Sequence, residues 1–206
     1  DQSFQVATSL GYFEVESVVV ASGGLSIPTL GGSGIGYEIA KQFGHHVYPT
    51  RAGLVPFTFS DGFKEVTTRL SGNAVEATLS NELNSFTEAL LFTHRGLSGP
   101  SSLQLSNYWD VGQSFKVDFL PSVDLLDFFK SKKQSQPKVL LRTLLNEYLP
   151  KSVVLELQNL IWVDVAETSI GNISDDKLEQ ITARLHGFEV KPSGTEGYRT
   201  AEVTLG

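Results

Sequence analysis

The amino-acid sequence predicts an α+β fold in which a helical block is embedded between strand-rich blocks. Short β-rich runs separated by turn residues occupy most of residues 1–121. Apolar residues three and four positions apart then dominate residues 122–186, and strand-like runs return at 188–190 and 200–205. With 206 residues, the chain is long enough for one large domain or two small ones.

The opening segment predicts a strand, a glycine-rich loop and a short helix. Two β-rich runs, residues 4–7 and 13–21, flank a turn, and the second is interpreted as a buried strand that leads into glycines. Residues 23–34 are rich in glycine and serine. Helical spacing follows as far as Gly44, a suitable residue for the end of a helix.

Several short strands are predicted in the next segment, which favours a small barrel or sandwich. The candidate strands are residues 54–59, 65–70, 74–79, 89–93 and 115–120, and the dipeptides Asp61-Gly62 and Gly72-Asn73 are interpreted as turns between strands. One short helix interrupts them, with Ser98 as its N-cap and Pro100 in its first turn.

Four helices are predicted after Pro121. Their ranges are residues 123–129, 138–148, 153–161 and 175–185. Ser174 is the expected N-cap of the last helix, and Gly187 ends the helical block.

The glycine-rich segment is a candidate ligand site. Glycines let a backbone pass close to a ligand, and free N–H groups at a helix start favour anions. The spacing departs from the dinucleotide fingerprint, because Tyr37 stands where the third glycine belongs after Gly32 and Gly34. The segment is therefore not interpreted as the main pyrophosphate loop. A plain strand and tight turn is the alternative for residues 18–24.

Residues 92–100 form a second candidate segment, with the sequence Phe-Thr-His-Arg-Gly-Leu-Ser-Gly-Pro. No motif identifies a catalytic acid or base, and His94 is the single candidate, chosen for its place beside a glycine-rich turn. Ser98 between glycines is similar to a nucleophile elbow, but Pro100 occupies the position of the last glycine. A structural turn with a capped helix is the alternative.

Charge and composition narrow the function. The chain carries 16 basic and 23 acidic residues, a net charge of −7, which we interpret as excluding nucleic acid as the main partner. No apolar run approaches the ~20 residues of a membrane helix, so no membrane partner is expected. A cytoplasmic location is expected, and the absence of cysteine is compatible with it. Cysteine is absent, and the adjacent His45 and His46 lack carboxylates at helical spacing, so no metal site is predicted.

Several short motifs occur in a fixed order along the chain. They are Ala21-Ser22-Gly23-Gly24, Pro28 with the glycines up to Tyr37, Gly44-His45, Leu54-Val55-Pro56, residues 92–100, and Glu202-Val203-Thr204-Leu205-Gly206. Together they resemble the BaiN-like group of bacterial NAD(P)/FAD-dependent oxidoreductases. Each motif is weak alone, but the ordered set is fairly specific.

The resemblance implies part of a split α/β FAD-binding domain, followed by an inserted β-barrel with an embedded helical subdomain. Residues 1–47 would belong to the FAD-binding domain, 48–121 and 187–200 to the barrel, and 122–186 to the helical insert. Residues 201–206 would be the return strand. The family's Gly-x-Gly-x-x-Gly loop and C-terminal flavin segment are missing from the sequence, so we expect an internal fragment.

The resemblance also implies a parent enzyme that transfers hydride from NAD(P)H through FAD to a small organic substrate. The residues expected to contact the cofactor are Ser22, Gly23, Gly24, Gly31, Gly32, Ser33, Gly34 and Gly36. We expect the isolated chain to lack FAD and to be inactive, with the remainder of its own FAD domain as its partner. The alternative is a non-catalytic module that caps a substrate pocket or binds a partner.

Overall fold

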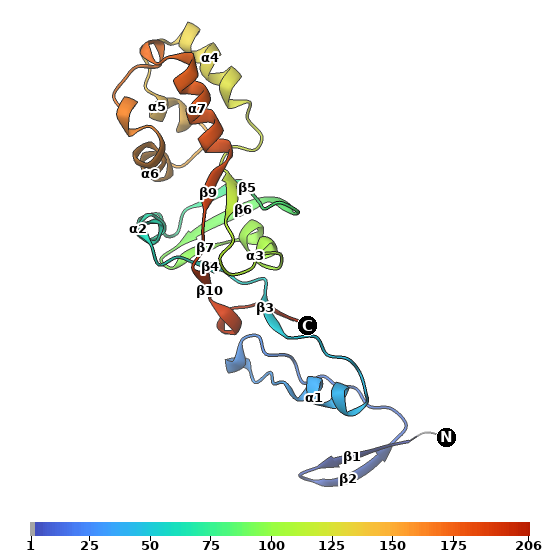
Figure 1. Ribbon diagram of the computed structural model, residues 1–206. Helices are drawn as coiled ribbons and strands as arrows, with labels where there is room; N and C mark the ends of the chain where they lie inside the picture. The colour runs from blue at the N-terminus through green and yellow to red at the C-terminus, as the bar shows by residue number, and fades with distance from the viewer. Residues whose placement is uncertain (1–2) are drawn as a thin grey trace.

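The computed structural model describes residues 3–206, which form an elongated molecule of three parts (Figure 1). The barrel part lies in the middle, and the N-terminal and helical parts lie at opposite ends. We define the N-terminal part as residues 3–50, the barrel part as residues 51–120 and 188–206, and the helical part as residues 121–187.

The N-terminal part contains a hairpin, a 3-10 turn and one helix. These are β1 (Phe4–Thr8), β2 (Gly11–Val15), η1 (Pro28–Leu30) and α1 (Ile35–Gln42). The prediction of a buried strand as far as Ala21 is wrong, since β2 ends at Val15 and Val19 is 88% exposed. A strand needs a neighbour for its backbone hydrogen bonds, and no strand in the described part of the chain pairs with residues 18–21.

The barrel part is built from short antiparallel strands. They are β3 (Arg51–Gly53), β4 (Phe57–Thr58), β5 (Ala74–Ser80), β6 (Ser85–Thr93), β7 (Gly96–Ser98), β8 (Phe115–Asp118), β9 (Phe188–Val190), β10 (Gly194–Thr195) and β11 (Val203–Leu205). One seven-stranded sheet has the order β10-β4-β7-β6-β5-β8-β9, and β3 pairs with β11 beside it.

The edges of this sheet must approach one another. The edge strands β9 and β10 are joined by residues 191–193 alone, a link that spans at most ~15 Å. A flat sheet of this order would separate its edges by ~29 Å, because neighbouring strands lie about 4.8 Å apart. The sheet therefore curls into a barrel, as the strand spacing in the sequence favours.

Residues 65–70, predicted as a strand, belong instead to helix α2 (Gly62–Arg69) and its C-cap. The carboxylate of Asp61 caps this helix by accepting a backbone N–H of the first turn at 3.1 Å. Val66 and Leu70, four residues apart, are both buried in the barrel core. The aspartate was interpreted only as a turn residue, although it is equally a helix N-cap.

Helix α3 (Pro100–Ser106) begins at the predicted proline, but Ser98 is not its N-cap. Ser98 is the last residue of β7 and pairs with β6, while Gly99 occupies the N-cap with a φ of 88°. A Cβ on Gly99 would lie 2.5 Å from the carbonyl oxygen of Ala89, so only glycine fits.

The helical part consists of short helices linked by 3-10 turns. They are α4 (Leu125–Ser135), α5 (Leu141–Leu145), α6 (Lys151–Ile161), η2 (Val163–Val165), η3 (Ile170–Asn172) and α7 (Asp175–His186). The helix predicted over 138–148 is shorter, because Leu140 is extended and forms a β-bridge with Ser169. The final 3-10 turn of the chain, η4 (Gly197–Arg199), lies in the barrel part.

Two predicted helix ends are confirmed. Gly44 follows α1 with a φ of 77°, and its N–H donates to the carbonyl of Lys41 at 3.0 Å. Ser174 caps α7, its hydroxyl accepting the N–H of Lys177 at 3.2 Å.

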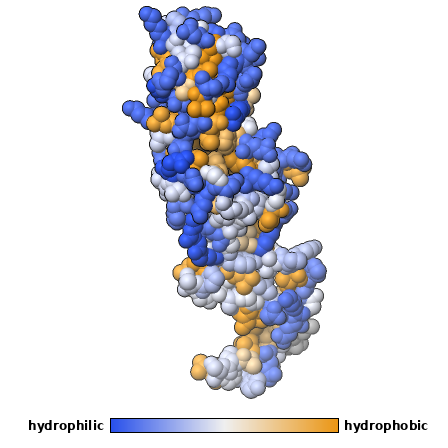
Figure 2. Space-filling model, turned by 60° about the vertical axis from the view of Figure 1, so that its left-hand side comes forward, coloured by the Kyte–Doolittle hydropathy of each residue, from blue (hydrophilic) through white to orange (hydrophobic). Residues whose placement is uncertain are grey.

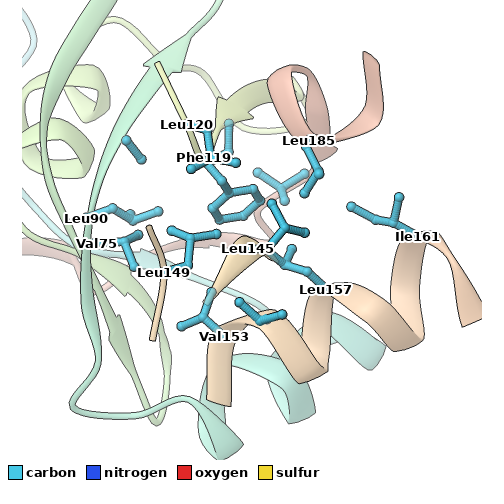
Figure 3. Close-up of a cluster of buried hydrophobic side chains, with 14 of the residues drawn as sticks. Val75, Leu90, Phe119, Leu120, Leu145, Leu149, Val153, Leu157, Ile161 and Leu185 are labelled. Carbon is cyan, nitrogen blue, oxygen red and sulfur yellow. The ribbon is translucent and has the colours of Figure 1, made fainter. Parts of the chain in front are cut away.

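One apolar core joins the helical part to the barrel part, as Figure 3 shows. Side chains from the helices meet side chains from the strands and the segment after β8. The helical set includes Leu145, Leu149, Val153, Leu157, Ile161 and Leu185, and the barrel set includes Val75, Leu90, Phe119 and Leu120. Because removing apolar area from water drives folding, these two parts form one folding unit.

The N-terminal part stands outside this core. Among the described residues, those with buried apolar side chains begin at Val55. The mixed helix and strand class is confirmed, whereas the split FAD-binding domain stays a prediction. No helix in residues 3–206 is both long and apolar enough to cross a membrane.

Candidate functional site

The two glycine-rich segments predicted as a ligand site come together in the N-terminal part. Where they meet, the N–H of Ser33 donates to the carbonyl of Ser22 at 3.3 Å. A Cβ on Gly32 would lie 2.7 Å from the carbonyl oxygen of Gly24. The two backbones therefore approach more closely than side chains would allow. We call this arrangement, residues 22–24 and 31–36, the glycine crossing.

The glycine crossing leaves polar groups without partners. The hydroxyl of Ser22 is buried and has no hydrogen-bond partner among the described residues. A Cβ on Gly36 would lie 3.1 Å from that hydroxyl. At the start of α1, no acceptor within residues 3–206 receives the N–H groups of Ile35 and Gly36. Such groups suit a ligand that carries phosphate or carbonyl oxygens.

Thr204 of β11 ties the glycine crossing to the barrel part. Its hydroxyl accepts the N–H of Leu25 at 3.1 Å and lies 2.9 Å from the hydroxyl of Ser26. A Cβ on Gly24 would approach both Thr204 and the Tyr37 hydroxyl to 3.1 Å. Sequence reasoning assigned no role to Thr204 or Tyr37, although both lie in the motifs that carried the resemblance.

A second connection joins the crossing to η4. Ile27 has a left-handed backbone with a φ of 47°, unusual for a β-branched residue, and its N–H donates to the carbonyl of Tyr198 at 2.7 Å. The hydroxyls of Tyr198 and Thr200 are buried without a hydrogen-bond partner among the described residues. The strained backbone and the unpaired hydroxyls lie at the junction between the N-terminal and barrel parts.

Within the candidate segment 92–100, residues 93–96 form the turn between β6 and β7. The hydroxyl of Thr93 accepts the N–H groups of Arg95 at 3.3 Å and Gly96 at 3.1 Å. A Cβ on Gly96 would lie 2.2 Å from the carbonyl oxygen of Phe57, so glycine is required where β7 passes β4. The glycines of this motif thus serve close strand packing.

An ion-pair cluster connects the same turn to η4. The carboxylate of Glu196, whose side chain is only 11% exposed, lies 3.3 Å from Arg95 and 3.2 Å from Arg199. His94, the candidate catalytic residue, is exposed, and its carbonyl accepts the hydroxyl of Thr68 at 3.2 Å. No hydrogen bond in the described part of the chain joins His94 to the glycine crossing.

The structure therefore brings the predicted glycine-loop residues together and leaves His94 apart from them. Whether these residues contact a cofactor stays a prediction. Within residues 3–206, no group of three or more His, Asp or Glu side chains has the arrangement of a metal site.

A curled antiparallel sheet that shares one core with a helical insertion is the class of domain defined by this fold. The chain belongs to the HI0933-like family, because the family model described as the HI0933-like protein barrel and H2TH domain matches residues 51–203. This match covers most of the barrel part and all of the helical part. The narrower assignment to the BaiN-like group stays a prediction.

Two characterised relatives are similar along nearly the whole chain. The ribosomal RNA dihydrouridine synthase of Escherichia coli (strain K12) is 46% identical over 200 residues, which are 93% of this chain and 48% of that protein. The protein of the same name from Haemophilus influenzae (strain ATCC 51907 / DSM 11121 / KW20 / Rd) is 43% identical over 198 residues, with 94% and 48% covered. The chain spans about half the length of the curated relatives it matches.

These names overturn the predicted function, with its alternative, and the predicted exclusion of nucleic acid. The relatives are named for a change made to ribosomal RNA. The predicted hydride transfer from NAD(P)H through FAD to a small organic substrate is therefore wrong, and so is its alternative, a non-catalytic capping module. The exclusion of a nucleic-acid partner is wrong as well. Net charge is a sum over the whole chain, whereas contact with RNA depends on the groups at one surface.

Proposed function

We propose that the protein containing this chain reduces uridine in ribosomal RNA to dihydrouridine. The observation that carries the proposal is sequence similarity to two proteins named ribosomal RNA dihydrouridine synthase. Their sequences are 46% and 43% identical to this chain over more than nine-tenths of its length. A match over more than nine-tenths of the chain extends over the glycine crossing and most of the barrel part.

The reaction constrains what the protein must hold. Converting uridine to dihydrouridine adds one hydride equivalent and one proton across a carbon–carbon double bond of the uracil ring. Two electrons must therefore come from a reductant. A reduced flavin, when bound, supplies these two electrons and is left oxidised.

The N-terminal part is the proposed flavin side of the protein. Its residues 1–47, with return strand 201–206, are proposed as parts of a split FAD-binding domain, while 48–121 with 187–200 form the barrel and 122–186 the helical insert. Three observations support a flavin at the crossing: the closely approaching backbones, the unpaired Ser22 hydroxyl, and the free N–H groups that begin α1. FAD as the flavin, and NAD(P)H as its reductant, stay predictions.

The exposed apolar surface of the N-terminal part also supports its assignment to a flavin-binding domain. Val18, Val19 and Val20 are each more than 40% exposed, and Figure 2 shows apolar patches over the lower end of the molecule. Water contact with a run of three valines is unfavourable. We propose that further segments of a longer protein cover this surface and complete the flavin-binding domain.

The residues of this chain would position the cofactor rather than take part in the chemical step. The glycine crossing would hold the cofactor through backbone N–H groups and the Ser22 hydroxyl, and Thr204 would fix the crossing against β11. His94, on a turn that contacts α2, stays a prediction as a catalytic residue.

The test is dihydrouridine formation in cells. The full-length protein containing this chain is produced in a bacterial strain that lacks its own ribosomal RNA dihydrouridine synthase. Nucleosides from purified ribosomal RNA are then measured by mass spectrometry. We expect dihydrouridine to return, and a folded protein that restores none would contradict the proposal.

A matched pair of glycine variants tests the role of the crossing. Gly32→Ala places a Cβ 2.7 Å from a carbonyl oxygen, whereas Gly62→Ala, in α2, meets no atom within 4 Å. We expect Gly32→Ala to lower both flavin content and dihydrouridine, and Gly62→Ala to change neither. Equal flavin content in the two purified full-length variants would remove the crossing from the proposed cofactor site.

A further inference from the structure

A surface hollow of about 460 Å³ lies beside the glycine crossing. Leu205, which follows Thr204 in β11, is one of the residues that line it. This volume falls within the ~300–1,000 Å³ range of small-molecule sites. The hollow lies where the N-terminal part joins the barrel part, and it is lined by Tyr48, Pro49, Arg51, Asn107, Tyr108, Leu205 and Gly206. We call it the tyrosine hollow.

Two tyrosines of the hollow expose large parts of their side chains. Tyr48 is 68% exposed and Tyr108 is 52% exposed. The Tyr108 ring stacks on Phe86 with centroids 5.8 Å apart and an interplanar angle of 22°, so its orientation is held by a neighbour. Tyr48 meets His46 edge to face at 4.6 Å. A supported ring with an open face is a suitable platform for another flat ring.

The floor of the hollow is fixed by hydrogen bonds. A guanidinium nitrogen of Arg51 donates to the carbonyl of Asn107 at 2.5 Å, and the amide oxygen of Asn107 accepts the N–H of Leu54 at 2.9 Å. Asn81 donates from its side chain to the carbonyl of Tyr108 at 2.7 Å. These contacts join β3 and the hairpin of β5 and β6 to the end of α3.

Arg51 gives the hollow a positive charge, which the carboxylate of Asp110 partly offsets. Arg51 is about half exposed and lies 3.6 Å from Asp110, which is itself 77% exposed. An exposed ion pair of this kind contributes little stability, so an incoming phosphate can replace the carboxylate at low cost.

We propose that the tyrosine hollow receives an unstacked nucleotide of the RNA substrate. The base stacks on Tyr108 and Tyr48, and Arg51 pairs with the adjoining phosphate. Aromatic side chains beside a cation are the usual means of holding single-stranded RNA. The inference rests on the proposed function and adds to it a contact surface next to the glycine crossing, in the same strand that carries Thr204.

The test measures binding of a fluorescein-labelled oligouridylate to the full-length protein by fluorescence anisotropy. Tyr108→Ala should raise Kd by between about 5-fold and 150-fold, which corresponds to ~1–3 kcal/mol for one stacked base. Tyr48→Ala should act in the same direction. Tyr108→Phe keeps an aromatic face and should bind nearly as wild type does.

Tyr12→Ala is the matched control, because Tyr12 is 78% exposed and lies in β2, at the far end of the N-terminal part. Equal Kd values for Tyr108→Ala and Tyr12→Ala would overturn the inference. A Tyr108→Ala variant with lower thermal stability and unchanged Kd would also overturn it, since the hollow would then be covered by protein.

The outcome is separable from that of the proposed function. If wild-type protein forms dihydrouridine in ribosomal RNA while both tyrosine variants bind oligouridylate normally, only the tyrosine hollow is rejected. If wild-type protein forms no dihydrouridine and binds no RNA, both proposals fail together.

Discussion

The N-terminal part and the barrel part use apolar residues in different ways. In the barrel part, Phe57 is 0% exposed and packs against Trp109 and Phe115, with ring centroids 5.2 and 4.8 Å away. In the N-terminal part, Val19 is 88% exposed although its sequence neighbours are also apolar. The same residue chemistry therefore marks a finished core in one part and an uncovered surface in the other. An apolar run indicates burial only when a second surface is present to cover it.

The largest expected effect is a difference in stability cost between a substitution in the barrel part and one in the N-terminal part. Phe57→Ala should lower the free energy of unfolding by about 3–5 kcal/mol, because it removes a ring from a closed core. Val19→Ala should change it by no more than ~0.5 kcal/mol, since the side chain already contacts water. Urea unfolding of the chain measures both values, and a cost for Val19→Ala near that of Phe57→Ala would mean that residues 18–20 are buried in solution.

An intermediate effect is expected at the link between the parts. Thr204→Val removes the acceptor of the Leu25 N–H and the partner of the Ser26 hydroxyl, at a cost of roughly 1–3 kcal/mol. The amide of Leu25 should then exchange its hydrogen about tenfold faster for each 1.4 kcal/mol lost. Thr204→Ser keeps the hydroxyl and should restore slow exchange. Equal rates in both variants would show that the link does not depend on this hydroxyl.

The smallest effect concerns acid stability of the helical part. Hydrogen bonds from Lys177, Arg142 and Lys133 lower the pKa values of Asp164, Glu167 and Asp175 respectively. A carboxyl whose pKa is lower in the folded state stabilises above its unfolded pKa, and this stabilisation is lost as pH falls through the lowered value. Melting temperature should therefore decrease as pH falls below about 4.5.

Glu167→Gln provides the control for the acid effect. It removes the charge that pairs with Arg142, so it should reduce the slope of melting temperature against pH and change the melting temperature near neutral pH only slightly. Because these pairs are exposed, the change should be small. An unchanged slope would mean that the pair is not formed in solution.

Much of the fold was predictable because its signals are local. Ser174 begins α7 and Gly44 follows the end of α1, as their side-chain and backbone chemistry predicts, and the period of the apolar residues predicts α6 and α7. The errors occurred where one residue type suits two structures. Asp61 was interpreted as a turn residue but caps α2, and Ser98 was interpreted as a cap but ends β7.

The candidate site was predictable only in part. Glycine spacing identified the crossing, because close backbone approach requires glycine whatever the fold. The contribution of Thr204 was hidden, since it lies 179 positions from Leu25 and only the paired strands β3 and β11 bring it near. The proposed contact with RNA was not predicted, because exposed tyrosines at one surface leave no trace in the net charge.

We propose that other segments of a longer protein cover residues 18–21, whereas the barrel and helical parts already bury a shared core within this chain. Hydrogen exchange measured by mass spectrometry, on the chain alone and on the full-length protein, tests it most directly. We predict fast exchange of residues 18–21 in the chain alone, strong protection of the same residues in the full-length protein, and equal protection of β5 and β6 in both. Equal exchange of residues 18–21 in the two proteins would contradict this proposal.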